Sequence, residues 1–356
     1  MAYTTIDDPT IFFNTKLYTG NGSTNAITGV GFQPDWVWIK ERNGASGNIV
    51  KDSVRGATPT LVTNSTGDES DFSAYFTSFD SDGFTLPNNS ATNESSSYNY
   101  AAWNWKAGTT SGISGSPSIT PSGYSFSQTA GFSIIGYTGN ASVGATIPHG
   151  LGVAPAVIFF KRRDASNEKW STYHHKAAAS SPEDVHLELN DTTAASNDDS
   201  ILNDTAPSST LITMKTSSSV NSNSIKYVAY CFSEIKGYSS HGSYTGNGNA
   251  NGAYVHLGFR PAWIMIKRTD NTGQWFMHDN KRVTFNVDNK YLAANDAAAE
   301  QTFTALDMLS NGFKLRTSGT GYNASGGNYV YLAFAESPFV NSSSVPNNAR
   351  WPCYKK

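Results

Sequence analysis

Three segments of this chain carry the same landmarks in the same order, and this repetition restricts the possible fold more than any other feature. Each segment opens with a Tyr-Thr-Gly-Asn turn, and these turns begin at Tyr18, Tyr137 and Tyr244. Each then reaches a proline that is followed by an apolar run and a lysine, and the prolines are Pro34, Pro155 and Pro261. A repeat of roughly 100 residues is too long for a solenoid unit and matches a whole small β-sandwich.

The apolar run after each proline predicts a central strand that is covered on both faces. Runs 36–39, 156–160 and 262–266 hold four or five apolar residues without alternation, and such a run has to be buried on both sides. Tryptophan and β-branched residues suit that pleated surface. The lysine after each run is expected to mark the point where the strand reaches water, and these lysines are Lys40, Lys161 and Lys267.

Two short turn motifs support an all-β prediction. Asp82-Gly83 and Asn311-Gly312 lie between apolar runs, where such dipeptides predict tight hairpins. Segment 296–309 has a helical composition taken alone, but its alignment with the first repeat favours strand, tight turn and strand. We therefore predict three tandem antiparallel β-sandwich domains, each with its own core.

The repeat landmarks also predict domain boundaries. We expect β-sandwich repeats at 1–108, 131–237 and 238–340. Segment 109–130 is rich in Gly, Ser and Pro and is expected to be a linker. Segment 341–356 is expected to be a C-terminal tail that docks through Trp351 and Cys353.

The composition excludes several classes of protein. Only 15% of the residues are charged, the formal net charge is −3, and like charges form no block, so we expect no nucleic-acid partner. Residues 1–5 lack a signal-peptide pattern, and no apolar run approaches the roughly 18 residues of a spanning helix, so no membrane insertion is expected. Cys231 lies in an aromatic run and is expected to be a buried, unpaired thiol.

Each motif that resembles a catalytic or metal site has a simpler structural explanation. Asp80 and Asp82 resemble the start of a calcium loop, but the downstream ligands are missing, and a hairpin turn explains them. The glycines of 246–252 precede a strand, so they cannot present a helix terminus to a phosphate. His174 and His175 are adjacent on a predicted strand and point to opposite faces, which disfavours a metal or acid–base site. We expect no enzyme activity, no metal and no cofactor, although a glycosidase carboxylate pair leaves no spacing signature and stays an open alternative.

Binding of a sugar is easier to support, because aromatic faces beside polar loops suit sugar rings. The candidate glycan-binding residues are Trp170, Tyr173, His174, Trp275 and His278. The alternative is that Trp170 and Trp275 point into the sandwich core.

Several longer motifs resemble one family. They are Tyr-Thr-Gly-Asn-Gly at 244–248, the proline-centred run at 258–268, Ser-Asn-Gly-Phe-Lys-Leu at 310–315, Tyr-Leu-Ala-Phe-Ala-Glu at 331–336 and His-Gly-Leu-Gly-Val-Ala-Pro at 149–155. The chain is similar to repeat proteins of marine bacteriophages that are described as tail-fibre or virion structural proteins. The resemblance covers nearly the whole chain and implies a jelly-roll or concanavalin-like sandwich for each unit, together with location in the virion. It carries no catalytic residues.

The leading functional hypothesis is a virion structural protein, a tail fibre or other surface appendage that contacts host-surface glycans. A capsid decoration or head-fibre protein is the first alternative, and the absence of coiled-coil heptads and collagen-like triplets keeps it competitive. A polysaccharide depolymerase is the second. The expected partners are other virion proteins, host-surface polysaccharide and further copies of the chain in a homo-oligomer such as a trimer.

Overall fold

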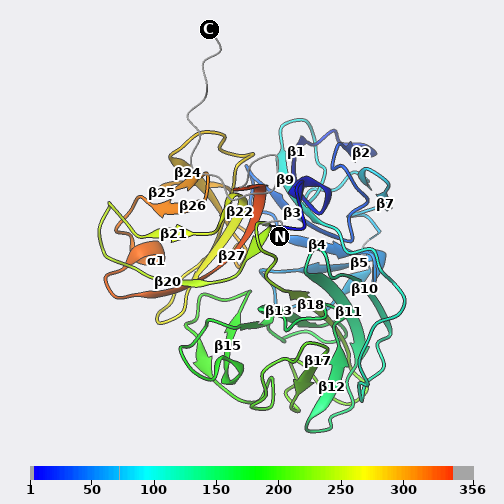
Figure 1. Ribbon diagram of the computed structural model, residues 1–356. Coiled ribbons are helices and arrows are strands. Elements are labelled where there is room, and N and C mark those ends of the chain that lie inside the picture. Colours follow the sequence, from blue (N-terminus) through cyan, green and yellow to red (C-terminus); the bar gives the residue numbers. More distant parts are fainter. Residues whose placement is uncertain (1–3, 72, 340–356) are drawn as a thin grey trace.

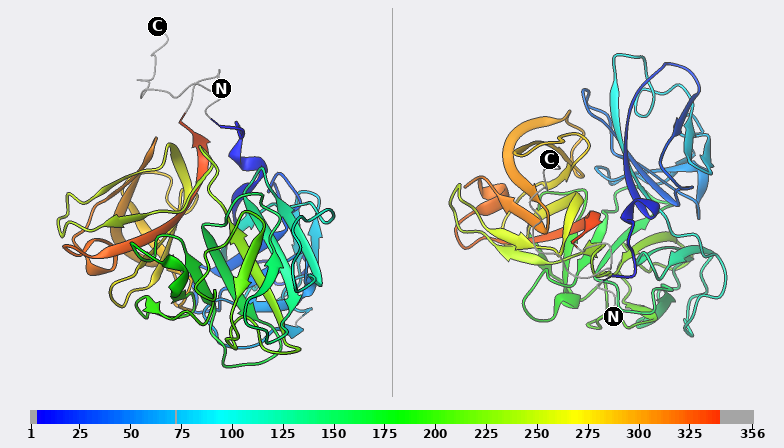
Figure 2. Two further views of the ribbon diagram at one scale, coloured as in Figure 1. Left: turned by 60° about the horizontal axis from the view of Figure 1, so that its bottom comes forward. Right: turned by 45° about the horizontal axis from the view of Figure 1, so that its top comes forward.

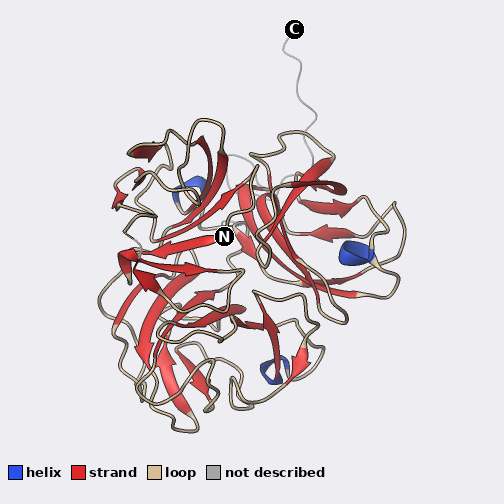
Figure 3. Ribbon diagram, turned by 180° about the vertical axis from the view of Figure 1, so that it is seen from behind, coloured by secondary structure: helices blue, strands red, loops and turns tan. Residues whose placement is uncertain are grey.

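The computed structural model describes residues 4–71 and 73–339, and their regular secondary structure consists almost only of antiparallel strands. Three lobes surround a common centre (Figure 1), and the view from behind shows strands in all three (Figure 3). The helices of the described residues are short: η1 (Pro9–Ile11), η2 (Pro182–Asp184) and α1 (Thr320–Asn323). In this part of the chain no helix is long and apolar enough to cross a membrane.

The first lobe contains two sheets. Its main sheet has the strand order β1-β9-β3-β4-β5-β6, and a small sheet has the order β2-β8-β7. The strands are β1 (Phe13–Thr19), β2 (Asn25–Thr28), β3 (Trp36–Glu41), β4 (Ile49–Asp52), β5 (Gly56–Val62), β6 (Ser70–Asp71), β7 (Ser78–Asp80), β8 (Gly83–Leu86) and β9 (Asn99–Trp105).

The second lobe repeats this plan. Its main sheet has the order β10-β11-β18-β13-β14-β15-β16, and β12 pairs with β17 in a small sheet. The strands are β10 (Gly123–Ser127), β11 (Phe132–Thr138), β12 (Ala145–Pro148), β13 (Val157–Arg162), β14 (Ser171–His174), β15 (Val185–Glu188), β16 (Ser196–Asn197), β17 (Leu211–Met214) and β18 (Lys226–Phe232).

In the third lobe the two layers belong to one continuous sheet of order β19-β27-β22-β23-β24-β25-β26-β21, and β20 also pairs with β27. The two further views separate this lobe, in yellow to red, from the other two (Figure 2). The strands are β19 (Ser239–Ser240), β20 (Ser243–Thr245), β21 (Tyr254–His256), β22 (Phe259–Arg268), β23 (Trp275–Asp279), β24 (Asp288–Ala293), β25 (Gln301–Leu309), β26 (Gly312–Leu315) and β27 (Asn328–Pro338).

The predicted all-β fold and both hairpins are confirmed. Asp80 pairs with Gly83 across the β7–β8 turn, and Leu309 pairs with Gly312 across the β25–β26 turn. The carboxylate of Asp82 accepts hydrogen bonds from the N–H groups of Gly29 and Gly31, at 2.9 and 2.7 Å. This aspartate therefore holds a loop in place.

The repeated tyrosine turn builds the same contact in every lobe. Its tyrosine stacks on a tyrosine of the last long strand of that lobe, with ring centroids 4.9 to 5.3 Å apart. Its asparagine N–H donates to the side-chain oxygen of another asparagine in each case. The stacked pairs are Tyr18 with Tyr100, Tyr137 with Tyr227, and Tyr244 with Tyr329.

Central strand β3 shows why its apolar run lacks alternation. Val37 and Ile39 point to an outer core between the two sheets of the first lobe. Trp36 and Trp38 point the other way, into a core to which all three lobes contribute. Strands β13 and β22 divide their side chains in the same manner between an outer core and this shared core.

The shared core corrects the expectation that each repeat has only a core of its own. Aromatic rings from different lobes meet there: Trp36 lies 4.9 Å from Tyr230, and Trp105 lies 5.7 Å from Trp263. A main sheet isolated from its neighbours would expose the large inner side chains to water, at a cost of roughly 1.5–3 kcal/mol for each. The three lobes consequently depend on one another.

Two predicted segments need comment. Segment 109–130, expected to be a linker, contains β10, whose residues Gly123 to Ser127 pair with β11 at the edge of the second main sheet. The predicted tail 341–356, with Trp351 and Cys353, lies outside the described residues. Cys231 is buried and unpaired as expected, and its burial raises the pKa of the thiol to about 12.

Candidate functional site

The five candidate glycan-binding residues are buried in the structure. None is more than 4% exposed, because they lie in or beside β14 and β23, strands that are covered on both faces. A sugar stacks on an aromatic face only where that face is open to solvent. The structure thus gives these side chains core positions, as the alternative interpretation had it for the two tryptophans. The residues are Trp170, Tyr173, His174, Trp275 and His278.

The two tryptophans connect neighbouring lobes. The ring N–H of Trp170 donates to the carbonyl of Val62 in the first lobe at 3.0 Å. The ring N–H of Trp275 donates to the carbonyl of Glu188 in the second lobe at 2.8 Å. In the first lobe, the side-chain amide of Asn48 donates to the carbonyl of Ala293 in the third lobe at 3.1 Å.

The three lysines that were expected to mark emergence into water are fully buried, which corrects that prediction. Each donates to a backbone carbonyl of another lobe, so its charge is solvated by carbonyl oxygens in place of water. Burial lowers the pKa of each ammonium to about 8. The cross-lobe bonds join Lys40 to Ala297 (3.0 Å), Lys161 to Thr66 (3.2 Å) and Lys267 to Thr192 (2.8 Å).

These bonds define three seams between lobes. In every seam the residue two positions after the lysine accepts, through its carbonyl, a backbone N–H of the adjacent lobe at 2.7 or 2.8 Å. Because the three bonds run in one rotational sense, the lobes are related by an approximate threefold arrangement. The donor and acceptor pairs are Glu300 to Arg42 in the first–third seam, Glu69 to Arg163 in the first–second seam and Ala195 to Thr269 in the second–third seam.

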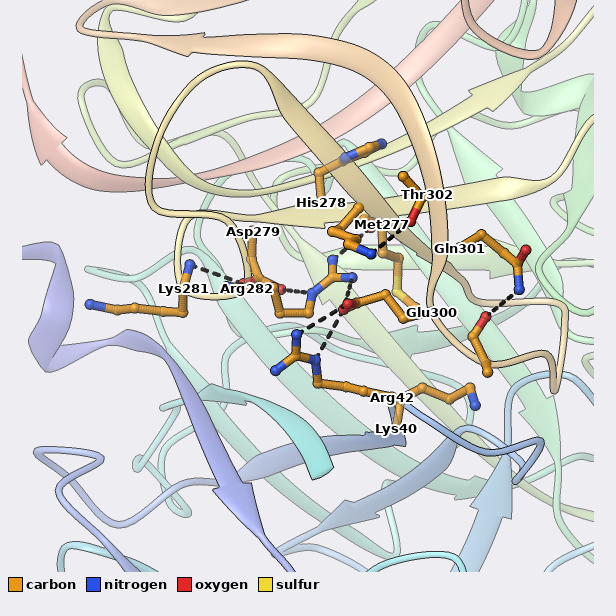
Figure 4. A network of polar contacts seen from close by, with 12 residues as sticks. Lys40, Arg42, Met277, His278, Asp279, Lys281, Arg282, Glu300, Gln301 and Thr302 are labelled. Carbon is orange, nitrogen blue, oxygen red and sulfur yellow. Dashed lines mark hydrogen bonds and ion pairs between the residues drawn. The ribbon is translucent and has the colours of Figure 1, made fainter. Parts of the chain in front are cut away.

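The first–third seam is closed by an ion-pair network. Arg42 and Arg282 approach Glu300 from two sides, and Arg282 also binds Asp279 (Figure 4). The ring N–H of Trp103 donates to Asp279 at 3.0 Å. Carboxylate and guanidinium groups therefore satisfy each other across this seam.

The first–second seam carries the same network in equivalent positions. Arg55 binds Asp52 and Glu69, and Arg163 adds two hydrogen bonds to Glu69, at 2.9 and 2.8 Å. The hydroxyl of Tyr230 donates to Asp52 at 2.6 Å. The two arginines lower the pKa of Glu69 in spite of its burial.

The second–third seam lacks this network. The strand registers place His174 opposite Val157, where Asp52 and Asp279 lie opposite the equivalent Trp36 and Trp263. Three residues after His174, Ala177 lies at the position that Arg55 and Arg282 take in the other two seams. In the equivalent backbone bond, Ala195 takes the position of the glutamates and Thr269 takes the position of the arginines of the other seams.

A cavity of about 630 Å³ lies at this seam. Its lining includes Ala177 and Thr269, the small residues that stand where the other seams carry arginines. The second lobe contributes the loop after β14 and the third lobe contributes β20 and the start of β27. The lining residues are His175, Lys176, Ala177, Ala178, Ala179, Pro182, Ser243, Tyr244, Thr245, Thr269, Asn328 and Tyr329.

Several polar groups of the cavity have no protein partner. Within 4–71 and 73–339, no hydrogen bond or ion pair involves the ammonium of Lys176, the hydroxyls of Ser243 and Thr245, or the side-chain amide of Asn328. No carboxylate is among the lining residues. The cavity consequently presents one cation with hydroxyl and amide groups.

Histidines gather beside the cavity. The Nε2 atom of His174 lies 3.2 Å from the carbonyl of Tyr331, and its Nδ1 accepts the N–H of Lys176 at 3.1 Å, so the ring is held as a neutral tautomer. Burial and the neighbouring His175 lower the pKa of His174 to about 3. Burial also lowers the pKa of His241, whose backbone carbonyl lies 2.5 Å from Nε2 of His175.

This arrangement is equipped to bind a polar ligand. In the part of the chain that the structure describes, no group of three or more His, Cys, Asp or Glu is placed to hold a metal ion. The buried carboxylates of Asp52 and Asp279 form ion pairs with arginines. The site was missed in the sequence because its residues are unremarkable singly; the signal that could have found it was Thr269 at the position of Arg42 and Arg163.

Comparison with known proteins gives one match. No curated protein and no solved structure matches the chain. A family model described as "Domain of unknown function (DUF7483)" matches residues 8–338, which include all three lobes. The chain therefore belongs to this family of unknown function.

Proposed function

We propose that this protein is a structural and binding component of a bacteriophage particle, placed on the virion surface, where it contacts host-surface glycans without catalysing a reaction. The observation that carries the proposal is the contrast between the seams. Ion-pair networks span two of the seams, and at the third seam the equivalent positions line a polar cavity. The sequence resemblance to phage tail-fibre and virion proteins supports the location.

The interlocked lobes suit a protein that has to survive outside a cell. Buried arginine–carboxylate networks and a shared aromatic core resist local opening, because breaking any part leaves charges or apolar surface unsatisfied. Sparse surface charge, with only 15% charged residues in the chain, fits an adhesive surface as well.

Location and copy number test this proposal. Gold-labelled antibody against the purified protein, viewed by electron microscopy on phage particles, should decorate an appendage. Quantitative mass spectrometry of the same particles should find a few tens of copies or fewer. Unlabelled particles, with the protein confined to the lysate, would overturn the proposal.

A capsid decoration protein is the second candidate, favoured by the compact three-lobed body, which has no shaft in the described residues (Figure 2). Hundreds of copies per particle would favour it over an appendage. Release of reducing ends from a host polysaccharide by the purified protein would instead replace the non-catalytic proposal with a depolymerase.

A further inference from the structure

We infer that the cavity of the second–third seam binds a saccharide that carries a carboxylate group. This inference rests on the proposed function and narrows it to one site and one ligand class. The cavity volume of about 630 Å³ lies within the roughly 300–1,000 Å³ range of small-molecule sites, which is enough for a short oligosaccharide.

The charge of the lining selects the ligand. Lys176 is exposed and extends from the loop after β14 without a protein partner for its ammonium among the described residues. Two nearby acids have other partners: Glu234 accepts from His241 and Ser240, and Asp270 accepts from Arg268 and Asn328. A third acid, Glu183, follows the lining residue Pro182 but is not itself part of the lining. An anionic group entering the cavity therefore meets a cation and no free carboxylate of the lining.

The uncharged groups suit sugar hydroxyls. The Asn328 side chain offers both an amide donor and a carbonyl acceptor, and Ser243 and Thr245 can each donate or accept. Ser243 and Thr245 lie two positions apart on β20, and Thr245 pairs with Asn328 on β27, so the three side chains point to the same face of this strand pair. The hydroxyls of Tyr244 and Tyr329 are already bonded to backbone carbonyls, and both rings pack in the outer core of the third lobe, so neither offers a free hydroxyl to a ligand.

A second cavity, of about 370 Å³, lacks these features. It lies between the first and second lobes, and its carboxylate, Asp35, already accepts from Ser53, Ser125 and Ala107. A carboxylated saccharide would find less free hydrogen-bonding capacity there.

Calorimetric titration of the whole chain with oligogalacturonate and with its methyl ester tests the inference. The ester keeps the sugar backbone but carries a methyl group in place of the negative charge on each carboxyl group. We expect the acid to bind at least tenfold more tightly than the ester. The variant Lys176→Ala should weaken binding of the acid about tenfold, and Lys226→Ala, which removes an exposed lysine outside the cavity, should leave it unchanged.

A gain-of-network variant tests the location independently. Ala177→Arg, Ala195→Glu and Thr269→Arg together introduce the two arginines and the glutamate of the other seams and should fill the cavity and abolish binding. Equal affinity for acid and ester, unchanged binding by Lys176→Ala, or retained binding by a folded triple variant would each overturn the inference. If the triple variant fails to fold, the comparison of Lys176→Ala with Lys226→Ala tests the inference. If the antibody labels the phage particles but the protein does not bind the acid, only the inference about this cavity is overturned. If the particles stay unlabelled, the proposed function is overturned.

Discussion

Glu69 and Arg163 are joined three times across the first–second seam. The backbone N–H of Glu69 donates to the carbonyl of Arg163 at 2.8 Å, and the two side chains share two further hydrogen bonds at 2.9 and 2.8 Å. At the second–third seam the equivalent Ala195 and Thr269 keep only the backbone bond. The backbone geometry of the repeat is thus retained where the side-chain chemistry is lost.

Removing the glutamate should damage the first–second seam severely. In Glu69→Ala, the buried Arg55 and the half-buried Arg163 each lose a partner, and breaking a buried pair costs about 3–5 kcal/mol. Urea unfolding should report a loss in that range. The control Asp199→Asn breaks the more exposed pair with Lys215 and should cost less than about 1 kcal/mol, since exposed pairs contribute little. Equal losses in the two variants would contradict the structural role of the seam.

Trp275 should behave as a core residue and not as a ligand contact. Trp275→Ala should lower the free energy of unfolding by about 3–5 kcal/mol through cavity formation. Trp275→Phe keeps most of the apolar volume but loses the bond to Glu188, so about 1–2 kcal/mol is expected. Saccharide affinity of the folded Phe variant should equal that of the wild type. A loss of saccharide affinity in Trp275→Phe with an unchanged free energy of unfolding would indicate that this tryptophan contacts the ligand.

Acid should weaken the protein through His174. The pKa of its imidazole is about 3 in the folded chain and about 6.5 when unfolded, so between these values the unfolded chain binds one more proton. The contribution of the neutral His174 to the free energy of unfolding is complete above about pH 6.5. It is lost as the pH falls toward 3, by up to roughly 1.4 kcal/mol per pH unit. Unfolding at pH 7 and pH 4.5 should give a smaller difference in His174→Gln than in the wild type. His256→Gln, at an exposed histidine, controls for loss of an imidazole; an unchanged difference in His174→Gln would refute the assignment.

Gly83 should tolerate no side chain. Its φ is +146°, and a Cβ there would lie 2.0 Å from the carbonyl oxygen of Ile27, a backbone atom that cannot turn away. Gly83→Ala should therefore cost more than about 2 kcal/mol in thermal unfolding. Gly56, with φ of +94° and open space around its Cβ position, is the matched control and should cost about 1 kcal/mol through backbone strain alone. Similar melting temperatures for the two variants would contradict the tight hairpin packing.

The shared core predicts cooperative unfolding of all three lobes. Differential scanning calorimetry should show one transition whose calorimetric and van't Hoff enthalpies agree. Residues 131–237 expressed alone would expose Trp170, Tyr230 and Phe232 and should fail to fold as a monomer. Three separate transitions, or a stable monomeric fragment, would restore independent modules.

The repeat landmarks predicted the strands well because local chemistry specifies them. The Asp82-Gly83 dipeptide predicts a tight turn, and the unbroken run at 36–39 has to be covered on both faces. What covers the inner face was not predictable from one strand, since any apolar surface would serve. The partner turned out to be two other lobes.

The lysine predictions failed for a related reason. A lysine at the end of an apolar run normally reaches water, and nothing within one repeat tells that carbonyls of another lobe replace it. Lys267, for example, donates to Thr192, 75 positions away in sequence. The burial of the candidate sugar-binding tryptophans has the same origin, because the partners of their ring N–H groups lie across a seam.

The unequal seams also set a stoichiometry. In the part of the chain that the structure describes, the three similar lobes carry the replacement of the arginines by Ala177 and Thr269 once around the ring, at the seam that holds the cavity. Triplication of the unit therefore builds a frame for one pocket and does not multiply it. A particle that binds its host through such pockets gains avidity only from several copies of the chain, because each copy contributes one binding site.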